Sequence, residues 1–388
     1  MTIWRPYGLS AFLLLISGPG SVAALYHNIY GAYAPQLFIF SHVQTTQTLS
    51  QEPSRSNQTT ITMSYKSTII ITGGTAGLGY QAALIIAKSK PDHLIILSSR
   101  TDKDGAAESI NTSLSQTNTI FVPLDLSDLD NIHTYANNFS TANYPPISAL
   151  LLNAGLQFPG PLSTIPSTGL ESTFAINHVG HVLLFHLLVP YFSSTETTRV
   201  IVTSSGTHDP AQKTAMPDAV YNSAEELAHP TSPAAVSRSG RQRYCTSKLC
   251  NVLWTYALHS RLAQYYPDKK IAVNAFDPGF MPGTGLTREA TAIQKFIVHR
   301  VLRPLVPLLR IVFIPNTHTT EESGRALARL AVEREVEGVS GKYYEGEKAI
   351  QTSVDSYDVR KQDDLWDWTL RFLSGGDEGI KKKWERFE

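Results

Sequence analysis

Residues 67–79 read STIIITGGTAGLG, and this stretch indicates the fold class. Its β-branched run, residues 69–72, is typical of a strand buried on both faces. Residues 80–88, YQAALIIAK, follow with the apolar pattern of a helix. Between strand and helix lie three glycines, Gly73, Gly77 and Gly79. This order predicts the first turn of a dinucleotide-binding βαβ unit, because a pyrophosphate must approach bare backbone N–H groups at a helix N-terminus.

The composition favours a globular chain without electrostatic attraction to polyanions. Of its 388 residues 42% are hydrophobic, which is ample for a core. The 33 basic and 33 acidic residues cancel, so we expect no nucleic-acid partner. The histidines are scattered, and we expect no metal site. Cys245 and Cys250 lie five residues apart in an expected helix and face different ways, which disfavours a disulfide and fits a reducing compartment.

Further apolar runs alternate with helical patterns along the chain. The runs predict strands at residues 94–97, 119–123, 147–152, 199–203, 271–276 and 339–344. Expected helices include one that ends at Phe139 with Ser127 as its N-cap, an apolar one at 170–189, and one at 321–332. This order predicts an α/β fold, a single Rossmann-type doubly wound parallel sheet of about seven strands with helices on both faces.

Polar side chains follow several of these strands, at the edge of the sheet where open α/β folds bind ligands. N-A-G at 153–155 follows the fourth strand, and two serines at 204–205 follow the fifth. Tyr244 and Lys248 are four residues apart and share one face of a helix. A nearby ammonium favours the phenolate and lowers a tyrosine pKa from its ordinary value of about 10. The pair is therefore a candidate for proton exchange with a substrate oxygen.

Taken together, these motifs resemble the short-chain dehydrogenase/reductase family. They are the T-G-x-x-x-G-x-G turn from Thr72, N-A-G, N-H-x-G-H starting at Asn177, the serine after the fifth strand, and Y-x-x-x-K. The resemblance covers about residues 68–368, and YCTSKLCN, NHVGH and SGKYY…LWDW resemble the branch with retinol dehydrogenases and protochlorophyllide reductases. It implies NADP(H) and lipophilic carbonyls or alcohols. It also implies four catalytic residues, with Ser205 favoured over Ser204: Tyr244, Lys248, Ser205 and Asn177.

The same resemblance implies a role for each position. Lys248 would bind the nicotinamide ribose, Asn177 would hold a water of the proton relay, and Ser205 would donate to the substrate oxygen. His178, His181 and His186, near Asn177, are expected to be packing or surface residues. The implied cofactor contacts are Gly73, Thr75, Gly77, Leu78, Gly79, Arg100, Asp125, Leu126, Asn153, Ala154, Gly155, Tyr244, Lys248, Pro278, Gly279 and Thr284.

The end of the second strand favours NADP over NAD. A carboxylate there would accept from a free ribose hydroxyl, but the chain has serines at 98–99 and then Arg100, whose guanidinium suits a phosphate. The alternative is that Arg100 is an ordinary exposed charge. Asp125, after the third strand, is placed either to accept from the adenine amino group or to form a turn.

The sixth strand runs into PGFMPGTGLTRE at 278–289, where the family's P-G turn passes under the nicotinamide. Thr284 stands one place later than the commonest family spacing, but matches a form found in the protochlorophyllide reductase branch. Residues 207–243 are expected to be a loop insert bordering the substrate pocket. His208, close after Ser205, is expected to be a loop histidine, with a substrate contact as the alternative. Residues 284–318 are expected to be a C-terminal substrate lid, and their apolar, basic part at 291–314 could instead rest on a membrane.

The first 62 residues precede the expected domain, residues 63–388. They contain an apolar stretch at 8–26, interrupted by Gly-Pro-Gly, and then a polar linker. We favour an extension or non-native start over a membrane anchor, and an anchor over a cleaved signal. The protein is expected in the cytoplasm, or on a membrane such as the endoplasmic reticulum if the N-terminal segment is retained.

The sequence therefore predicts an NADP-dependent oxidoreductase that interconverts a small lipophilic carbonyl compound and its alcohol, with tyrosine as acid and base. A tailoring step in secondary metabolism fits by analogy alone. The alternatives are NADPH-dependent reduction of a conjugated C=C bond and a non-catalytic NADP-binding scaffold.

Overall fold

Eight strands form one sheet in the part of the chain that the structure describes. The structure is a computed structural model, and it describes residues 65–158, 160–281 and 316–388. The strand order is β3-β2-β1-β4-β5-β6-β7-β8, parallel throughout except for the antiparallel pair β7 and β8. The strands are β1 Thr68–Thr72, β2 Leu94–Ser99, β3 Thr119–Pro123, β4 Ile147–Leu152, β5 Thr198–Thr203, β6 Ile271–Asp277, β7 Tyr343–Glu345 and β8 Lys348–Ile350.

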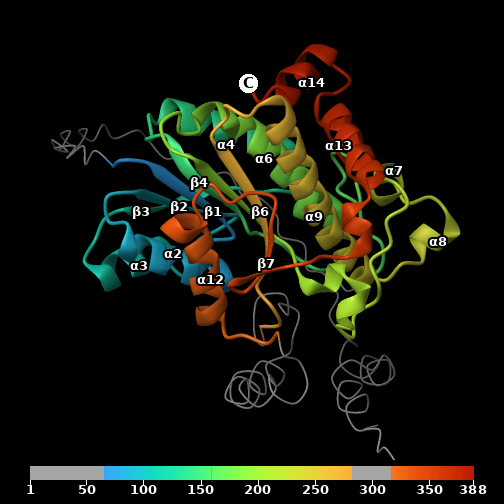
Figure 1. The fold of residues 1–388 in the computed structure, drawn as a ribbon, viewed down its shortest axis with the longest axis horizontal. Coiled ribbons are helices and arrows are strands. Elements are labelled where there is room, and N and C mark those ends of the chain that lie inside the picture. Colours follow the sequence, from blue (N-terminus) through green and yellow to red (C-terminus); the bar gives the residue numbers. More distant parts are fainter. Residues whose placement is uncertain (1–64, 159, 282–315) are drawn as a thin grey trace, which may run out of the picture. The chain divides into compact units, whose positions relative to one another are not determined.

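Helices cover both faces of this sheet (Figure 1), as the sequence predicted. Because side chains alternate along a strand, Ile69 and Ile71 of β1 enter one core and Ile70 enters the other. The first core is closed by α2 Gly77–Ser89, α3 Ala106–Leu114 and α12 Thr320–Val332. The second is closed by α4 Leu129–Thr141, α6 Gly180–Leu188 and α9 Gly240–Tyr265.

Two C-terminal helices enlarge the second core. They are α13 Val359–Leu373, which lies beside α9 (Figure 1), and α14 Glu378–Glu385. The remaining short helices are α5 Ser172–Phe174, the π-helix η1 Ala175–Val179, η2 Val189–Tyr191, η3 Gly206–His208, η4 Pro210–Gln212, α7 Ala224–Ala228, α8 Pro233–Val236, η7 Arg334–Val336 and η8 Val354–Tyr357.

Three expectations about local structure need correction. The eighth strand, β8, was missed; it pairs with β7 across a two-residue turn in which Gly346 has a φ of +57°. The expected loop 207–243 contains short helices, among them α7 and α8. Asp128, and not Ser127, caps α4, because its carboxylate accepts from the N–H groups of two residues in the first turn.

One described segment, Ser172–Tyr191, is long and apolar enough to cross a membrane. Almost all of it is buried inside the protein, where it contributes to the second core, so its apolar character is accounted for by packing. The expected N-terminal extension 1–62, the apolar stretches 8–26 and 291–314, and Thr284 lie outside the described residues. So does the expected lid 284–318, apart from its last three residues.

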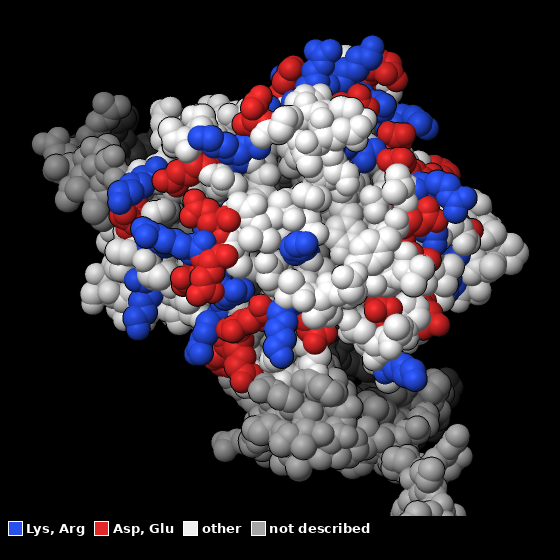
Figure 2. Space-filling model, viewed as in Figure 1, with Lys and Arg blue, Asp and Glu red and all other residues white. Residues whose placement is uncertain are grey.

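Acidic and basic side chains are interspersed around the edge of the face shown in Figure 2, and its middle is largely uncharged. This matches the equal numbers of acidic and basic residues in the sequence. The described part of that face carries no continuous basic stripe of the kind that follows a phosphate backbone.

Candidate active site

The predicted site residues gather at the carboxyl ends of the parallel strands. Strand order reverses between β1 and β4, and open α/β sheets bind ligands in the crevice at such a switch point. The glycine turn follows β1, N-A-G follows β4, Ser205 follows β5, and the P-G turn follows β6.

The glycine turn has the form that a pyrophosphate requires. Gly73 and Gly77 have φ values of +69° and +54°, in the left-handed region where glycine is favoured. A Cβ at Gly79 would lie 2.3 Å from the carbonyl oxygen of Gly73, so this position must be bare for the turn to close. A Cβ at Gly77 would meet nothing within 4 Å, and no side chain caps the N-terminus of α2. The turn therefore has room and backbone donors for a phosphate group.

The N-A-G turn is tied to the first strand through Thr72. The Thr72 hydroxyl accepts from the N–H groups of Asn153 and Ala154, at 2.8 and 2.9 Å. The Asn153 side chain donates to the carbonyl of Thr72 at 2.9 Å and accepts from the Thr203 hydroxyl at 3.3 Å. Asn153 thus joins β1 to β5.

Asn177 lies in the π-helix η1, a feature that the apolar pattern did not reveal. Its amide exchanges two hydrogen bonds with the backbone of Leu156, each 2.9 Å, and donates to the Ser247 hydroxyl at 3.0 Å. A Cβ at Gly155 would lie 3.2 Å from Lys248 Nζ and 3.6 Å from Asn177 Oδ1. Bare backbone at Gly155 therefore leaves room between the lysine and Asn177.

His181 forms a buried polar link, whereas the sequence suggested simple packing. Its Nδ1 faces the carbonyl of Asn177 at 3.2 Å and therefore carries the proton. Its Nε2 lies 3.0 Å from Thr72 Oγ1, whose hydroxyl has both this nitrogen and the carbonyl of Leu151, at 3.2 Å, as acceptors. His181 thus connects the main chain of Asn177 to the threonine that holds the N-A-G turn. His178 and His186 are buried in the second core, as packing residues.

Helix α9 presents Tyr244 and Lys248 to the end of β5. Both side chains are buried, at 7% and 3% exposure, which places them out of bulk water. Lys248 Nζ lies 5.6 Å from the centre of the Tyr244 ring and donates to the carbonyl of Thr203 at 3.0 Å. The Tyr244 phenol lies close to the Ser205 side chain. The structure therefore brings the predicted tyrosine, lysine and serine together.

The electrostatics of this pair differ from the expectation. Burial raises the pKa of Tyr244 above its ordinary value, and the nearby Ser205 side chain only partly opposes this. Burial lowers the pKa of Lys248 to about 8, because the charged form loses its hydration. The net shift of the Tyr244 pKa is therefore opposite to the lowering that the sequence led us to expect.

The two serines after β5 have different surroundings. Ser204 is buried and donates to the carbonyl of Lys248 at 2.8 Å, so it holds α9 against the strand. Ser205 accepts from the N–H of Thr207 at 3.3 Å and faces Tyr244, which favours it as the substrate contact. His208 is fully buried, and its Nδ1 donates to the carbonyl of Ser205 at 2.7 Å.

The predicted adenosine contacts lie at the ends of β2 and β3. Arg100 is exposed, and no described residue forms an ion pair with it. Asp102, the carboxylate nearest in sequence, accepts from the N–H groups of Ala106 and Ala107 in the first turn of α3. Asp125 Oδ1 accepts from both the N–H and the hydroxyl of Ser127, which is the turn role that the sequence left open.

The backbone of Leu126 packs closely against the start of α6. A Cβ at Gly180 would lie 2.4 Å from the carbonyl oxygen of Leu126, so glycine permits this close approach. Thr75, in the glycine turn, is half-buried, and its hydroxyl donates to the carbonyl of Thr101 at 3.5 Å. Leu78 is buried in the first core at the start of α2. Pro278 and Gly279 form the turn after β6, and Gly279 has a φ of +74°.

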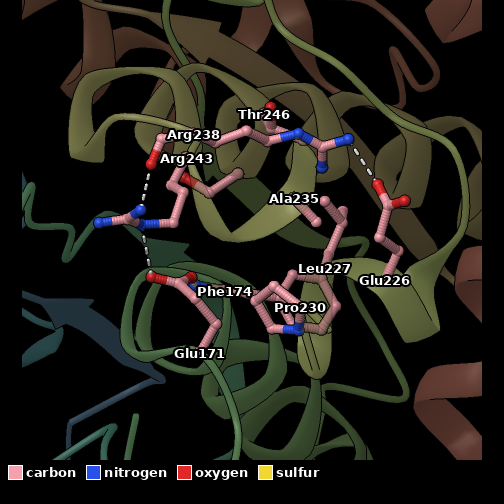
Figure 3. A pocket seen from close by; sticks show the side chains of 10 residues that line it. Glu171, Phe174, Glu226, Leu227, Pro230, Ala235, Arg238, Arg243 and Thr246 are labelled. Atoms are coloured by element: carbon pink, nitrogen blue, oxygen red, sulfur yellow. Dashed lines mark hydrogen bonds and ion pairs between the residues drawn. The ribbon is translucent and has the colours of Figure 1, made fainter. Parts of the chain in front are cut away.

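Beside α9, a small pocket contains a buried ion pair (Figure 3). Arg243, the residue before Tyr244, lies 3.3 Å from Glu171, and both side chains are at most 6% exposed. Arg243 also donates to the carbonyls of Arg238 and Gly160. Burial raises the pKa of Glu171 in spite of its basic partner. The pair fixes the start of α9 against the helix that leads to Asn177.

Glu171→Gln should destabilise the protein by about 2 kcal/mol, because it leaves a buried guanidinium without its counter-charge. Chemical unfolding of the variant and wild type measures this difference. The matched control is Glu226→Gln, which breaks the more exposed pair with Arg238 in the same pocket and should cost less than about 1 kcal/mol. Equal effects of the two changes would contradict a special role for the buried pair.

Several residues of the site were not found from the sequence. Ser247 binds Asn177, Asn251 donates to the same Thr203 carbonyl as Lys248, and Asp277 ends β6 as a buried carboxylate. For Asp277 a signal existed, since a charged residue at the end of an apolar strand needs a partner. Ser247 and Asn251 could have been found because they lie on the same helix as Tyr244 and Lys248.

The comparisons with known proteins agree with this geometry. A short chain dehydrogenase model matches residues 67–224, and an AcuH dehydrogenase domain model matches residues 285–379. A polyprenol dehydrogenase from Danio rerio is 26% identical, over 76% of this chain and 83% of the relative. A chloroplastic protochlorophyllide reductase from Pisum sativum is 27% identical, over 78% of this chain and 76% of the relative.

Solved structures show the same fold. The Pseudomonas aeruginosa RhlG/NADP active-site complex superposes with a TM-score of 0.51 at 19% identity, covering 72% of this chain and 94% of that one. Members of the matched family bind a nicotinamide cofactor and act on CH–OH and C=O groups. The chain therefore resembles the short chain dehydrogenases over residues 67–224, and it is an oxidoreductase of that type.

Proposed function

We propose that this protein is an NADP(H)-dependent oxidoreductase that interconverts a lipophilic carbonyl compound and its alcohol. The observation that carries the proposal is the buried meeting of Tyr244, Ser205 and Lys248 at the carboxyl end of β5. A substrate oxygen placed there would be within reach of two hydroxyl groups. The apolar Phe280, half exposed directly after the predicted nicotinamide turn, suits a lipophilic substrate.

Each residue of the site has a role in the proposed reaction. When bound, NADPH supplies a hydride to the substrate carbon. Tyr244 donates its phenolic proton to the substrate oxygen, while the Ser205 hydroxyl hydrogen-bonds that oxygen and orients it. Because burial raises the pKa of Tyr244, the phenol keeps its proton at neutral pH, which is the form that reduction of a carbonyl needs.

Lys248 and Asn177 would support this step. The ammonium of Lys248 lies beside bare backbone at Gly155, where it can hydrogen-bond the nicotinamide ribose. Asn177 Oδ1 also faces the space beside Gly155, although the Asn177 amide already hydrogen-bonds Leu156 and Ser247. We therefore propose that the asparagine acts by fixing the walls of the site and a relay water between them.

Turnover assays with a panel of substrates test this function. Purified protein should consume NADPH with some members of a set of lipophilic aldehydes and ketones. Activity confined to conjugated enones would assign C=C reduction, which the similarity to a protochlorophyllide reductase makes the second candidate. Tight NADPH binding without turnover of any compound would leave a binding scaffold as the better description.

Arg100→Ala should weaken NADPH binding by about tenfold or more and change NADH binding by less than about twofold, because only NADPH has a 2′-phosphate for the guanidinium. Titration of both cofactors against the variant and wild type measures the two ratios. Lys103→Ala, which removes a neighbouring exposed cation, is the control and should leave both affinities nearly unchanged. Equal losses for the two cofactors would contradict the phosphate contact.

A further inference from the structure

Asp277 is a buried carboxylate for which the proposed reaction has no role. It is the last residue of β6 and is 1% exposed. Its Oδ1 accepts from the N–H of Gly279 at 2.8 Å, and its Oδ2 accepts from the Asn316 side chain at 2.9 Å. Gly206 also lies against this carboxylate, since a Cβ there would lie 3.0 Å from Oδ2.

The three neighbours belong to three separate parts of the candidate site. Gly206 follows Ser205 directly and begins η3. Gly279 belongs to the turn that the family resemblance places under the nicotinamide. Asn316 lies where the described chain returns to this turn, since its carbonyl accepts from the N–H of Phe280 at 2.7 Å. One side chain therefore connects the serine segment, the nicotinamide turn and the returning chain.

The carboxylate also lies within electrostatic range of the proposed catalytic pair. Lys248 and Tyr244 on α9 both interact with its charge, as do Tyr343 and Glu345 on β7. Burial raises the pKa of Asp277 to about 6, so the group is largely ionised at neutral pH. An ionised buried carboxylate is costly, and the hydrogen bonds from Gly279 and Asn316 offset part of that cost.

We propose that Asp277 is a positioning residue that holds the Ser205–Gly206 segment against the Pro278–Gly279 turn. It acts through those two segments and touches neither the substrate nor the reacting atoms. Asp277 thereby fixes the distance between the Ser205 hydroxyl, which orients the substrate oxygen, and the Pro278–Gly279 backbone, which supports the nicotinamide ring. This inference rests on the proposed function, because it takes the turn after β6 to be the nicotinamide site.

Asp277→Asn tests the proposal, since it keeps the shape and replaces one acceptor oxygen by a donor. The new amide would face the N–H of Gly279 or the Asn316 amide, so one donor in the cluster loses its acceptor. We expect NADPH affinity to fall by about tenfold or more. The affinity for 2′,5′-ADP, which lacks the nicotinamide half, should change by less than about twofold.

A second substitution distinguishes positioning from a general loss of stability. In Asp277→Asn/Asn316→Asp the exchanged side chains can again hydrogen-bond, so NADPH affinity should recover in part. Glu345→Gln, which removes another carboxylate near Asp277, is the matched control and should leave NADPH affinity unchanged. Thermal unfolding of all four proteins shows whether each one is folded under the conditions of the titration.

Three results would overturn the proposal: unchanged NADPH affinity in Asp277→Asn, equal losses for NADPH and 2′,5′-ADP, or no recovery in the double variant. A different result would reject the proposed function. If the wild type binds NADPH but turns over no compound of the panel, catalysis is rejected, and the comparison of the two ligands still decides the role of Asp277.

Discussion

Tyr244→Phe should lower kcat by about 10²–10⁴-fold, the range typical of losing a general acid. The phenol is a buried proton donor close to Ser205, and phenylalanine keeps the ring but has no proton to give. NADPH affinity should stay within about twofold, because Lys248 and the glycine turn are untouched. Steady-state turnover of a substrate found in the panel and a separate NADPH titration measure the two quantities.

The matched control for this change is Tyr256→Phe. Tyr256 lies on the same helix, three turns further along, and its hydroxyl hydrogen-bonds Thr352 at 2.9 Å. The control therefore also removes one tyrosine hydroxyl from α9, but at a place remote from Ser205. Turnover in Tyr244→Phe as high as in Tyr256→Phe would falsify tyrosine catalysis. A loss shared by both would indicate damage to the helix.

The sheet was predictable where burial leaves a direct trace in the sequence. A parallel strand covered on both faces is a continuous apolar run, and residues 119–123 and 147–152 became β3 and β4 with the expected bounds. β8 is an exposed edge strand with the sequence KAI, which has no such run and no alternation. Its position depends on the hairpin turn with β7, a feature of backbone geometry at Gly346.

The site was predictable as a set of motifs but not as a network. Each motif marks a residue type that the proposed chemistry needs at a strand end or on a helix face. The bonds that hold those residues join distant parts of the chain, as between Thr72 and His181 or between Asp277 and Asn316. No local pattern encodes such a pair, so His181, which links the N-A-G turn to Asn177, looked like a packing residue.

The π-helix at Asn177 shows the same limit. Its residues are apolar enough to continue the helix on either side, so the sequence predicted one regular helix over 170–189. The wider turns of the π-helix are visible only in its backbone hydrogen bonds. They direct the Asn177 amide toward Leu156 and Ser247.

His186→Leu should stabilise the protein increasingly as the pH falls, by several kcal/mol at about pH 4 relative to wild type. His186 is buried among aromatic rings, including Trp384 and Phe387, and neither ring nitrogen has a hydrogen-bond partner. Burial lowers its pKa to about 3, because the charged form has no water or acceptor there. Leucine is of similar size and does not titrate.

The sign follows from which state binds the proton. The ordinary histidine pKa is about 6.5, so below that pH the unfolded chain takes up a proton at His186 and the folded chain does not. Stability from this group is therefore complete above about pH 6.5 and is lost as the pH falls toward the folded value of about 3. The loss is on the order of 1 kcal/mol for each pH unit in that window.

Chemical unfolding of wild type and His186→Leu at several pH values between about 7 and 4 measures the effect. Any change in packing contributes equally at every pH, so the growth of the difference reports the proton alone. Val182→Ala, which creates a cavity on the same helix, is the control, and its cost should not depend on pH.

His178 and His181, whose pKa values burial lowers to about 3 and about 4, act in the same direction as His186. Asp277 and Glu171, whose pKa values burial raises, oppose them, so the variant isolates one histidine from a sum of opposing groups. A stability difference that stays constant from neutral to acid pH would show that His186 is hydrated or paired in the folded protein.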